Sequence, residues 1–287
     1  HELYDKVIRE HAKNMAFVLV GGYRAQLRQR GVSTASLARY NSAFLYGPDG
    51  EQSDKQYSKI HLVPFGEFVP FRKSLPPLYN LLMMFTPYDY DYSLDAGTEY
   101  TVFEMSSGEG ENERIYRFSV MICYEDAVPE IARRFARGEQ GQKRLDWLVN
   151  ISNDGWFVQL KDEKIVPSTE LAQHAAICVF RAVENRLAVV RSVNTGVSCL
   201  IDSLGRVKDG YQAGNLPGEA MARTACAGWF IDRVAIDKRT TFFSRYGQWL
   251  DFFCAFCLFL LIIVPTSARF IRNTKYAVSL RRHKKEN

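Results

Sequence analysis

A cysteine that could act as a nucleophile, Cys123, ends an apolar run that begins at Phe118. Three polar residues follow it at once: Tyr124, Glu125 and Asp126. Ligand sites in α/β sheets collect at the carboxyl ends of strands, so a thiol in this position would face a substrate from a rigid support. Free cysteines are more often inert core residues, and this pattern alone leaves that alternative open.

A lysine and a glutamate, Lys59 and Glu67, stand in the upstream segment KIHLVPFGE. Lys59 alternates with apolar neighbours at the end of a predicted hairpin strand, and Glu67 follows a proline and a glycine that favour a sharp turn. A lysine that points inward needs a carboxylate or an anionic intermediate as its partner. Glu67 could supply the first, and a reaction could supply the second. A solvated strand lysine and a loop glutamate would fit the local pattern equally well.

These residue types suit nucleophilic catalysis through a thioester. The thiolate is the nucleophilic form of cysteine, so a base and a nearby cation must favour ionisation of Cys123. Lys59 could be that cation. His61 and His174 lack the spacing of a metal-ligand set, and we interpret both as structural. We therefore expect no metal and no cofactor.

The elements that must position these residues alternate along the chain. Buried strands are predicted for four apolar runs, at 16–22, 118–123, 147–151 and 188–192. Helices are predicted for three segments, at 1–15, 129–137 and 169–186. Turn residues at 47–50 and 203–205 indicate hairpins. Strand, helix and hairpin recur in the same order, which predicts an α/β fold whose two sheets face one another under helices.

Composition limits the classes of protein that this chain can be. Its 287 residues, 47% hydrophobic and 24% charged, argue against disorder and allow one large domain or two smaller ones. Much of the net charge of +5 comes from the C-terminal tail, so the charge gives no support to nucleic-acid binding. The six cysteines show no disulfide framework, and we interpret Cys254 and Cys257 as apolar helix residues.

A membrane span is predicted near the C-terminus. Trp249 to Val264 contains a single charge, Asp251. At about 1.5 Å per residue this run covers roughly 24 Å, and extension to Phe270 would match a hydrocarbon core of about 30 Å. The basic residues that follow favour a transmembrane helix over a buried core helix. A short basic flank stays cytoplasmic, which would put the large domain on the opposite face.

Four blocks in order carry a resemblance to a known family, and they read KIHLVPFGEFVP at 59–70, MICYE at 121–125, ISNDGWF at 151–157 and FRAVENRLAVVRSVNTG at 180–196. They resemble the nitrilase, or carbon-nitrogen hydrolase, superfamily, and within it the apolipoprotein N-acyltransferases, bacterial enzymes that add the third acyl chain to lipoproteins. The resemblance covers nearly the whole chain. It implies a nitrilase-like α-β-β-α sandwich over 1–240, a transmembrane helix over 241–270 and a basic cytoplasmic tail over 271–287.

The resemblance also gives the motif residues their roles. Lys59 matches the catalytic lysine and Cys123 the nucleophile. Glu67 matches a supporting carboxylate of the lysine block. Tyr124 and Glu125 match the pair that follows the nucleophile in the acyltransferases, where the glutamate would support the loop around the cysteine.

Two segments would bind the acyl substrate. Trp156 matches an aromatic residue near the family's site. The segment Leu75–Tyr92 contains Met83, Met84 and Phe85 within a consecutive apolar run. Such a run, if exposed, is an aggregation hazard in water but a plausible lipid-facing arm at a membrane. A core helix is the alternative.

One family residue has no match. The family's first glutamate, the general base, precedes the first helix and lies upstream of the strand predicted at 16–22. Glu2 and Glu10 are available, but their context is helical surface. We therefore expect the base to lie upstream of residue 1, the chain to be the C-terminal part of a longer protein, and the fragment alone to be inactive.

The implied reaction is acyl transfer in two steps. Cys123 would take an acyl chain from a phospholipid, and the α-amine of a diacylglyceryl-cysteine apolipoprotein would take it from the thioester. The expected partners are the phospholipid donor, the apolipoprotein and membrane lipid, at the periplasmic or outer face of a bacterial inner membrane. Two alternatives are an amidase that hydrolyses a small amide or nitrile and a membrane-anchored binding module without activity.

Overall fold

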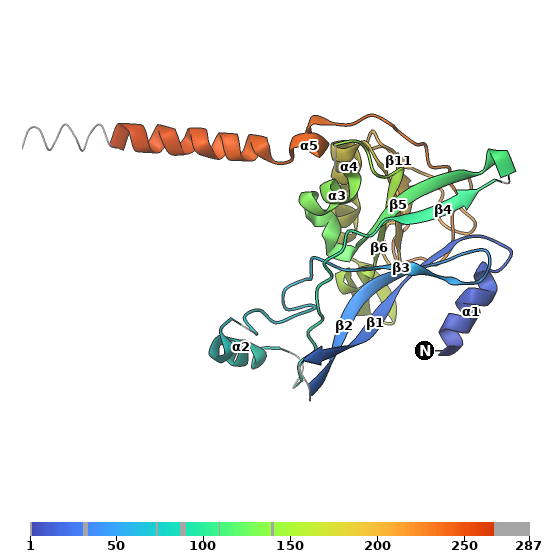
Figure 1. Ribbon diagram of the computed structural model, residues 1–287, viewed down its shortest axis with the longest axis horizontal. Coiled ribbons are helices and arrows are strands. Elements are labelled where there is room, and N and C mark those ends of the chain that lie inside the picture. The colour runs from blue at the N-terminus through green and yellow to red at the C-terminus, as the bar shows by residue number, and fades with distance from the viewer. Residues whose placement is uncertain are drawn as a thin grey trace, which may run out of the picture. The chain divides into compact units, whose positions relative to one another are not determined.

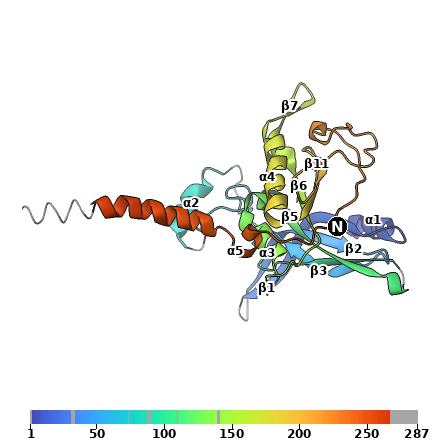
Figure 2. The ribbon, with the colours of Figure 1, turned by 90° about the horizontal axis from the view of Figure 1, so that it is seen from above.

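The computed structural model describes residues 2–30, 34–72, 74–86, 90–108, 110–138 and 141–266. The chain forms two compact units, His1–Arg245 and Tyr246–Asn287. The first unit is built from two facing sheets with helices on their outer sides, as Figures 1 and 2 show. This arrangement confirms the predicted α-β-β-α sandwich.

The smaller sheet has three antiparallel strands, β1 (Val18–Arg30), β2 (Thr34–Tyr46) and β3 (Gln52–Ser58), in that order. The sequence analysis predicted a first strand at 16–22, but β1 continues through Gly21 and Gly22 to Arg30. Gly21 pairs with Ala43 of β2, and a Cβ on Gly21 would lie 3.1 Å from a methyl carbon of Ile151 in the other sheet. The glycines therefore let the two sheets approach closely instead of ending the strand.

The larger sheet has the strand order β11-β10-β9-β6-β5-β4. Its strands are β4 (Phe103–Ser107), β5 (Arg114–Ile122), β6 (Trp147–Ser152), β9 (Ala188–Val193), β10 (Cys199–Ile201) and β11 (Val207–Lys208). The three central strands β5, β6 and β9 are parallel. Because the carboxyl ends of parallel strands meet at one edge, the residues that follow these three strands are brought together there.

Helices cover both outer faces. The strands of the larger sheet pack against α3 (Pro129–Ala136) and α4 (Glu170–Asn185). The smaller sheet packs against α1 (Glu2–Ala12), where the Tyr46 hydroxyl donates to Asp5 at 2.7 Å. The short helix α5 (Phe242–Tyr246) follows at the end of the first unit. Proline at the start of α3, within the helix predicted at 129–137, suits the first helical turn.

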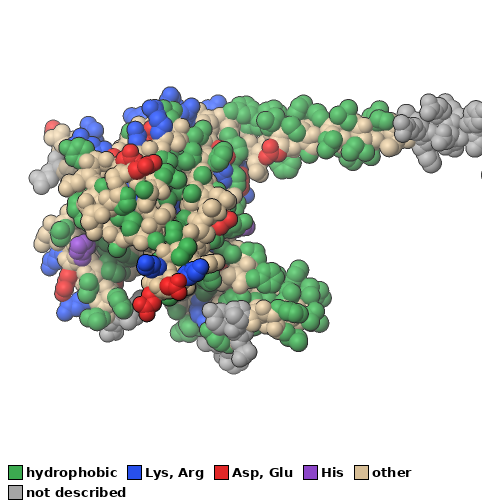
Figure 3. Space-filling model, turned by 180° about the vertical axis from the view of Figure 1, so that it is seen from behind, with side chains coloured by type: hydrophobic (Ala, Val, Ile, Leu, Met, Phe, Trp, Pro, Cys, Tyr) green, Lys and Arg blue, Asp and Glu red, His purple; other side chains and the backbone are tan. Residues whose placement is uncertain are grey.

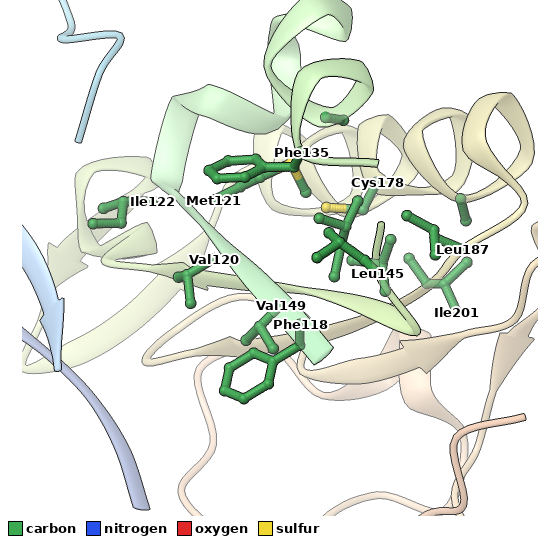
Figure 4. Packing of buried hydrophobic residues seen from close by; sticks show 14 of the residues in the cluster. Phe118, Val120, Met121, Ile122, Phe135, Leu145, Val149, Cys178, Leu187 and Ile201 are labelled. Carbon is green, nitrogen blue, oxygen red and sulfur yellow. The ribbon is translucent and has the colours of Figure 1, made fainter. Parts of the chain in front are cut away.

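The core lies on both faces of β5. Figure 4 shows Met121 beside Phe135 of α3, while Phe118 and Val120 point to the opposite face. On that opposite face the apolar side chains of the smaller sheet, such as Tyr57 of β3, complete the core between the sheets. A strand buried on both faces reads as a continuous apolar run, and that run is what ends at Cys123.

The first unit also contains shorter elements. The helix α2 (Pro76–Met83) lies in the apolar segment Leu75–Tyr92, and the hairpin of β7 (Val158–Lys161) and β8 (Lys164–Pro167) projects from the body in Figure 2. Two 3₁₀ turns, η1 (Gly110–Asn112) and η4 (Ala220–Ala222), lie in connections.

The second unit contains a helix over Trp249–Thr266, 18 residues with a mean hydropathy of 2.2 and none of them buried. At about 1.5 Å per residue it is about 27 Å long, so by length and composition it could cross a membrane. The predicted cytoplasmic tail, 271–287, lies outside the described residues.

Candidate active site

Cys123 stands where β5 turns sharply. It begins the 3₁₀ turn η2 (Cys123–Ala127) with a φ of +52°, a left-handed conformation that costs a non-glycine residue about 1–3 kcal/mol. Two bonds hold the backbone around it: the Ile122 amide donates to Glu125 at 2.8 Å, and the Asn150 side chain donates to the Cys123 carbonyl oxygen at 3.3 Å. The thiol is half-buried on this rigid turn.

Lys59 is buried and faces a carboxylate, so the inward-pointing lysine is the correct interpretation and the solvated strand lysine is not. It follows the last residue of β3, is 1% exposed, and its Nζ donates to Glu67 Oε2 at 2.6 Å. The Val63 amide donates to the same oxygen at 2.8 Å, and Asn41 of β2 donates to Oε1 at 2.9 Å. Glu67 is thus fixed by three donors and neutralises the buried ammonium.

Glu125 joins the lysine segment to the cysteine turn. Its side chain is fully buried and accepts four hydrogen bonds. Oε1 accepts from the Tyr57 hydroxyl at 2.6 Å and from the amides of Ile60 and His61 at 2.7 and 3.1 Å. Burial raises the pKa of Glu125, although these donors and the Ile122 amide oppose the rise. Burial also raises the pKa of Tyr57, and the Glu125 charge adds to this rise.

The position of Glu125 explains how residues far apart in sequence share one site. Ile60 follows Lys59 and Ile122 precedes Cys123, and both amides donate to this one carboxylate. Glu125 therefore holds the backbone of the lysine segment and that of the cysteine turn together.

Tyr124 and Trp156 are both on the surface. Tyr124 is 45% exposed, and its ring stacks on His61 with centroids 6.0 Å apart. Trp156 is 71% exposed and belongs to the 3₁₀ turn η3 (Asp154–Phe157), which follows β6, the strand beside β5. Both side chains are therefore free to contact a ligand approaching this edge of the sheet.

The apolar segment around α2 is an excursion whose two ends meet beside Glu67. The Leu94 amide donates to the Glu67 carbonyl oxygen at 2.8 Å, and the Val69 amide donates to the Ser93 hydroxyl at 3.3 Å. The residues between these ends are here called the α2 arm. No residue of the helix α2 itself is buried, which excludes the core-helix alternative. Figure 3 shows hydrophobic side chains gathered over this lobe.

The three predicted lipid contacts lie at and just after the C-terminal end of α2. Met84 is 78% and Phe85 80% exposed, and Met83 is half-buried. A cavity of about 960 Å³ lies elsewhere, lined mostly by polar residues of the smaller sheet and of the segment 96–102. None of the predicted site residues lines that cavity, so we assign it no part in the chemistry.

The sequence analysis did not identify several residues that build the site. Asn41 and Asn150 lie on strands and orient Glu67 and the Cys123 turn. Behind that turn, a buried cluster contains Asp126, Asp154 and Arg191 together with His174, which we had taken as structural. Charged residues inside apolar strands and helices are a usable signal, and Arg191 in AVVRSV is such a case.

A cysteine on a strained turn and a buried lysine paired with glutamate stand on an α-β-β-α sandwich, and a second buried glutamate links their segments. The family model described as Carbon-nitrogen hydrolase matches residues 6–216. The chain belongs to the carbon-nitrogen hydrolase family.

Within this family, the chain is similar to proteins named apolipoprotein N-acyltransferases. The apolipoprotein N-acyltransferase of Geobacter metallireducens is 34% identical over 217 residues, which cover 75% of this chain and 34% of that protein. Apolipoprotein N-acyltransferase 1 of Treponema pallidum is 34% identical over 265 residues, which cover 88% of this chain and 40% of that protein. The chain thus spans between a third and two fifths of the length of these relatives. The resemblance inferred from the four sequence blocks is confirmed.

Among solved structures, a carbon-nitrogen hydrolase from Helicobacter pylori G27 aligns with a TM-score of 0.40 and 16% identity, covering 72% of this chain and 61% of that one.

Proposed function

We propose that the protein carries an acyl chain from a phospholipid, through a thioester on Cys123, to the amine of a diacylglyceryl-cysteine at an apolipoprotein N-terminus. The observation that supports this most is the buried Lys59–Glu67 pair, joined through Glu125 to the turn that carries the thiol. Relatives that are similar over most of this chain are named apolipoprotein N-acyltransferases.

The first step forms the thioester. The Cys123 sulfur attacks the acyl carbonyl carbon of the phospholipid, and the Lys59 ammonium stabilises the negative charge on the carbonyl oxygen. The tetrahedral intermediate then expels the glycerol oxygen, which takes up the proton that the thiol lost and leaves as a lysophospholipid. The strained left-handed turn fixes the backbone conformation from which the Cys123 thiol attacks.

The second step consumes the thioester. The acceptor amine attacks the same carbonyl carbon, the Cys123 sulfur leaves as a thiolate, and the amine loses one proton to form an amide. Both half-reactions use one oxyanion position, which suits a ping-pong scheme. Each requires a base to move the proton. Glu10 does not supply it, because it is exposed on α1 and pairs with Lys6 at 3.9 Å.

The α2 arm brings the acyl chain from the bilayer. Its exposed side chains, among them Met84 and Phe85, enter the apolar part of a membrane, and the two ends of the arm meet beside Glu67. The helix Trp249–Thr266 anchors the protein in the same membrane. We place the catalytic domain on the periplasmic or outer face of a bacterial inner membrane, with the basic C-terminal residues in the cytoplasm.

The test uses the protein encoded by the complete gene, purified in detergent and returned to vesicles that carry an alkyne-labelled acyl phospholipid. We expect a hydroxylamine-sensitive label on Cys123 that is chased onto a diacylglyceryl-cysteine peptide. Cys123→Ala should abolish the label, while Cys226→Ala, which removes another half-buried thiol, should retain it. Absence of the thioester would refute the proposal, and release of ammonia from small amides would favour an amidase instead.

A further inference from the structure

His174 connects two turns of the site from behind. It lies on α4, is 7% exposed, and its two ring nitrogens face carboxylates on opposite sides. Nδ1 lies 3.0 Å from Asp154 Oδ1, and Nε2 lies 3.1 Å from Asp126 Oδ1. Asp126 belongs to the Cys123 turn η2, and Asp154 begins the turn η3 that carries Trp156. One imidazole thus bridges the nucleophile turn and the neighbouring turn.

Within the described residues, the charged groups that contact this ring belong to one buried cluster. Arg191 of β9 donates to Asp126 Oδ2 at 3.2 Å and to Asp154 Oδ2 at 2.7 Å. Cys178, one turn along α4, donates to Asp126 at 3.2 Å, and the Arg181 side chain donates to the Asp126 backbone at 3.0 Å. Arg181 forms its own ion pair with Glu184 at 2.8 Å. The carboxylates of Asp126 and Asp154 therefore stand against Arg191 and His174. A protonated ring makes this buried set neutral, whereas a neutral ring leaves one negative charge in excess.

The hydrogen bonds require the protonated ring. Carboxylate oxygens only accept, and a neutral imidazole has a single N–H, so it can donate to Asp126 or to Asp154 but not to both. Burial alone would lower the pKa of His174, but the bonds to Asp126 and Asp154 outweigh it and raise the pKa to about 9. For Asp154, burial alone would raise the pKa of the carboxyl, but the hydrogen bond from His174 and the charge of Arg191 lower that pKa below its ordinary value.

The cluster also reaches the backbone of the nucleophile. Arg191 donates to the Asn150 side chain, whose amide donates to the Cys123 carbonyl oxygen. On the other side, a Cβ on Gly196 would lie 2.0 Å from Asp154 Oδ2, so only glycine leaves room for this carboxylate. A change at His174 is thus transmitted to the turn that holds the thiol in its left-handed conformation.

We propose that His174 is a positioning residue whose protonated ring holds the Cys123 turn and the Trp156 turn together, so that the acylation rate of Cys123 depends on the proton that His174 carries. This inference deepens the proposed function and rests on Cys123 as its nucleophile. Loss of the proton releases one of the two carboxylates, and the turn that it anchors loosens. The reactivity of Cys123 then falls at alkaline pH, although thiol ionisation alone would make it rise.

The experiment measures acylation of Cys123 by a small soluble ester, p-nitrophenyl butyrate, between pH 6 and 10 in the protein encoded by the complete gene. We expect a falling limb near pH 9 in the wild type. His174→Gln keeps the size of the side chain but cannot titrate, so it should lower the rate at pH 7.5 about tenfold and remove the falling limb. His11→Gln, which changes an exposed histidine on α1, should leave the profile unchanged.

A second measurement needs no variant. Nitrogen-15 NMR of labelled histidine should show both ring nitrogens of His174 protonated at pH 7.5 and a titration near pH 9. A neutral ring at pH 7.5, or a falling limb that persists in His174→Gln, would overturn the inference. Ester acylation with the expected profile but no thioester from phospholipid would retain the inference and refute only the phospholipid donor.

Discussion

The four bonds of Glu125 allow the coupling between Lys59 and Cys123 to be tested by graded substitutions. Tyr57→Phe removes one of three donors to Oε1. Glu125→Gln keeps an oxygen for those three donors but turns an NH₂ group toward the Ile122 amide, where two donors meet. Glu125→Ala leaves all four donors without their acceptor.

The structure gives the order of the effects. Loss of the single tyrosine bond costs about 1 kcal/mol, because Oε1 retains two donors. Glu125→Gln leaves one buried donor unsatisfied and costs about 1–3 kcal/mol, and Glu125→Ala costs several times as much. The cost of Glu125→Ala is then comparable with the total stability of a domain, about 5–15 kcal/mol. We therefore expect that Glu125→Ala does not fold. For a domain of this size, about 1 kcal/mol lowers the melting temperature by about 2–4 °C.

The assay combines the melting temperature, measured by tryptophan fluorescence in detergent, with the rate of Cys123 acylation by p-nitrophenyl butyrate. We expect Tyr57→Phe to slow acylation less than threefold and Glu125→Gln to slow it at least tenfold, because only the glutamine loses the bond next to Cys123. Equal rates for the two variants, or a Glu125→Gln protein as reactive as the wild type, would show that Glu125 does not hold the lysine segment and the cysteine turn together.

Three further perturbations follow from the same contacts. Glu67→Gln leaves the buried Lys59 ammonium without its carboxylate, so we expect a loss of about 3–5 kcal/mol in thermal denaturation and a large fall in acylation rate. The substitutions Met84→Glu and Phe85→Glu should slow acylation from phospholipid vesicles far more than acylation by the soluble ester, when the two rates are measured side by side. Equal slowing of both rates would contradict a lipid-facing arm. The folded-state pKa of His174, about 9, exceeds its ordinary 6.5, so its stabilisation is complete below pH 6.5 and is lost as pH rises through 9. The loss is about 3 kcal/mol, and it should appear as a melting temperature that falls between pH 6.5 and 9.5 in the wild type but not in His174→Gln.

The order of apolar and polar residues was sufficient to predict most of the central strands and covering helices. The apolar run that ends at Cys123 predicted a strand buried on both faces, and the structure has that strand as β5. The helix predicted at 129–137 is one residue longer than α3 at its C-terminal end, and the helix predicted at 169–186 is one residue longer than α4 at each end. These features follow from the order of apolar and polar residues and from turn chemistry, both of which a single sequence displays.

Local pattern failed where distant segments meet. The first strand was predicted to end at Gly22, because nothing nearby in the sequence shows that Ile151 of the other sheet packs against Gly21. The helix α2 was hidden among prolines that also suit a loop, although one of them serves as the first helical residue.

The sequence by itself determined which residues could do chemistry: a thiol after a buried strand, a lysine between apolar neighbours and carboxylates beside each. Only the tertiary structure decided how they are held. Glu125 meets an amide 65 residues away, and His174 meets carboxylates 20 and 48 residues away. The reason is that a buried carboxylate must find donors wherever packing has placed them, and the packing of two sheets and a helix is a property of the whole chain.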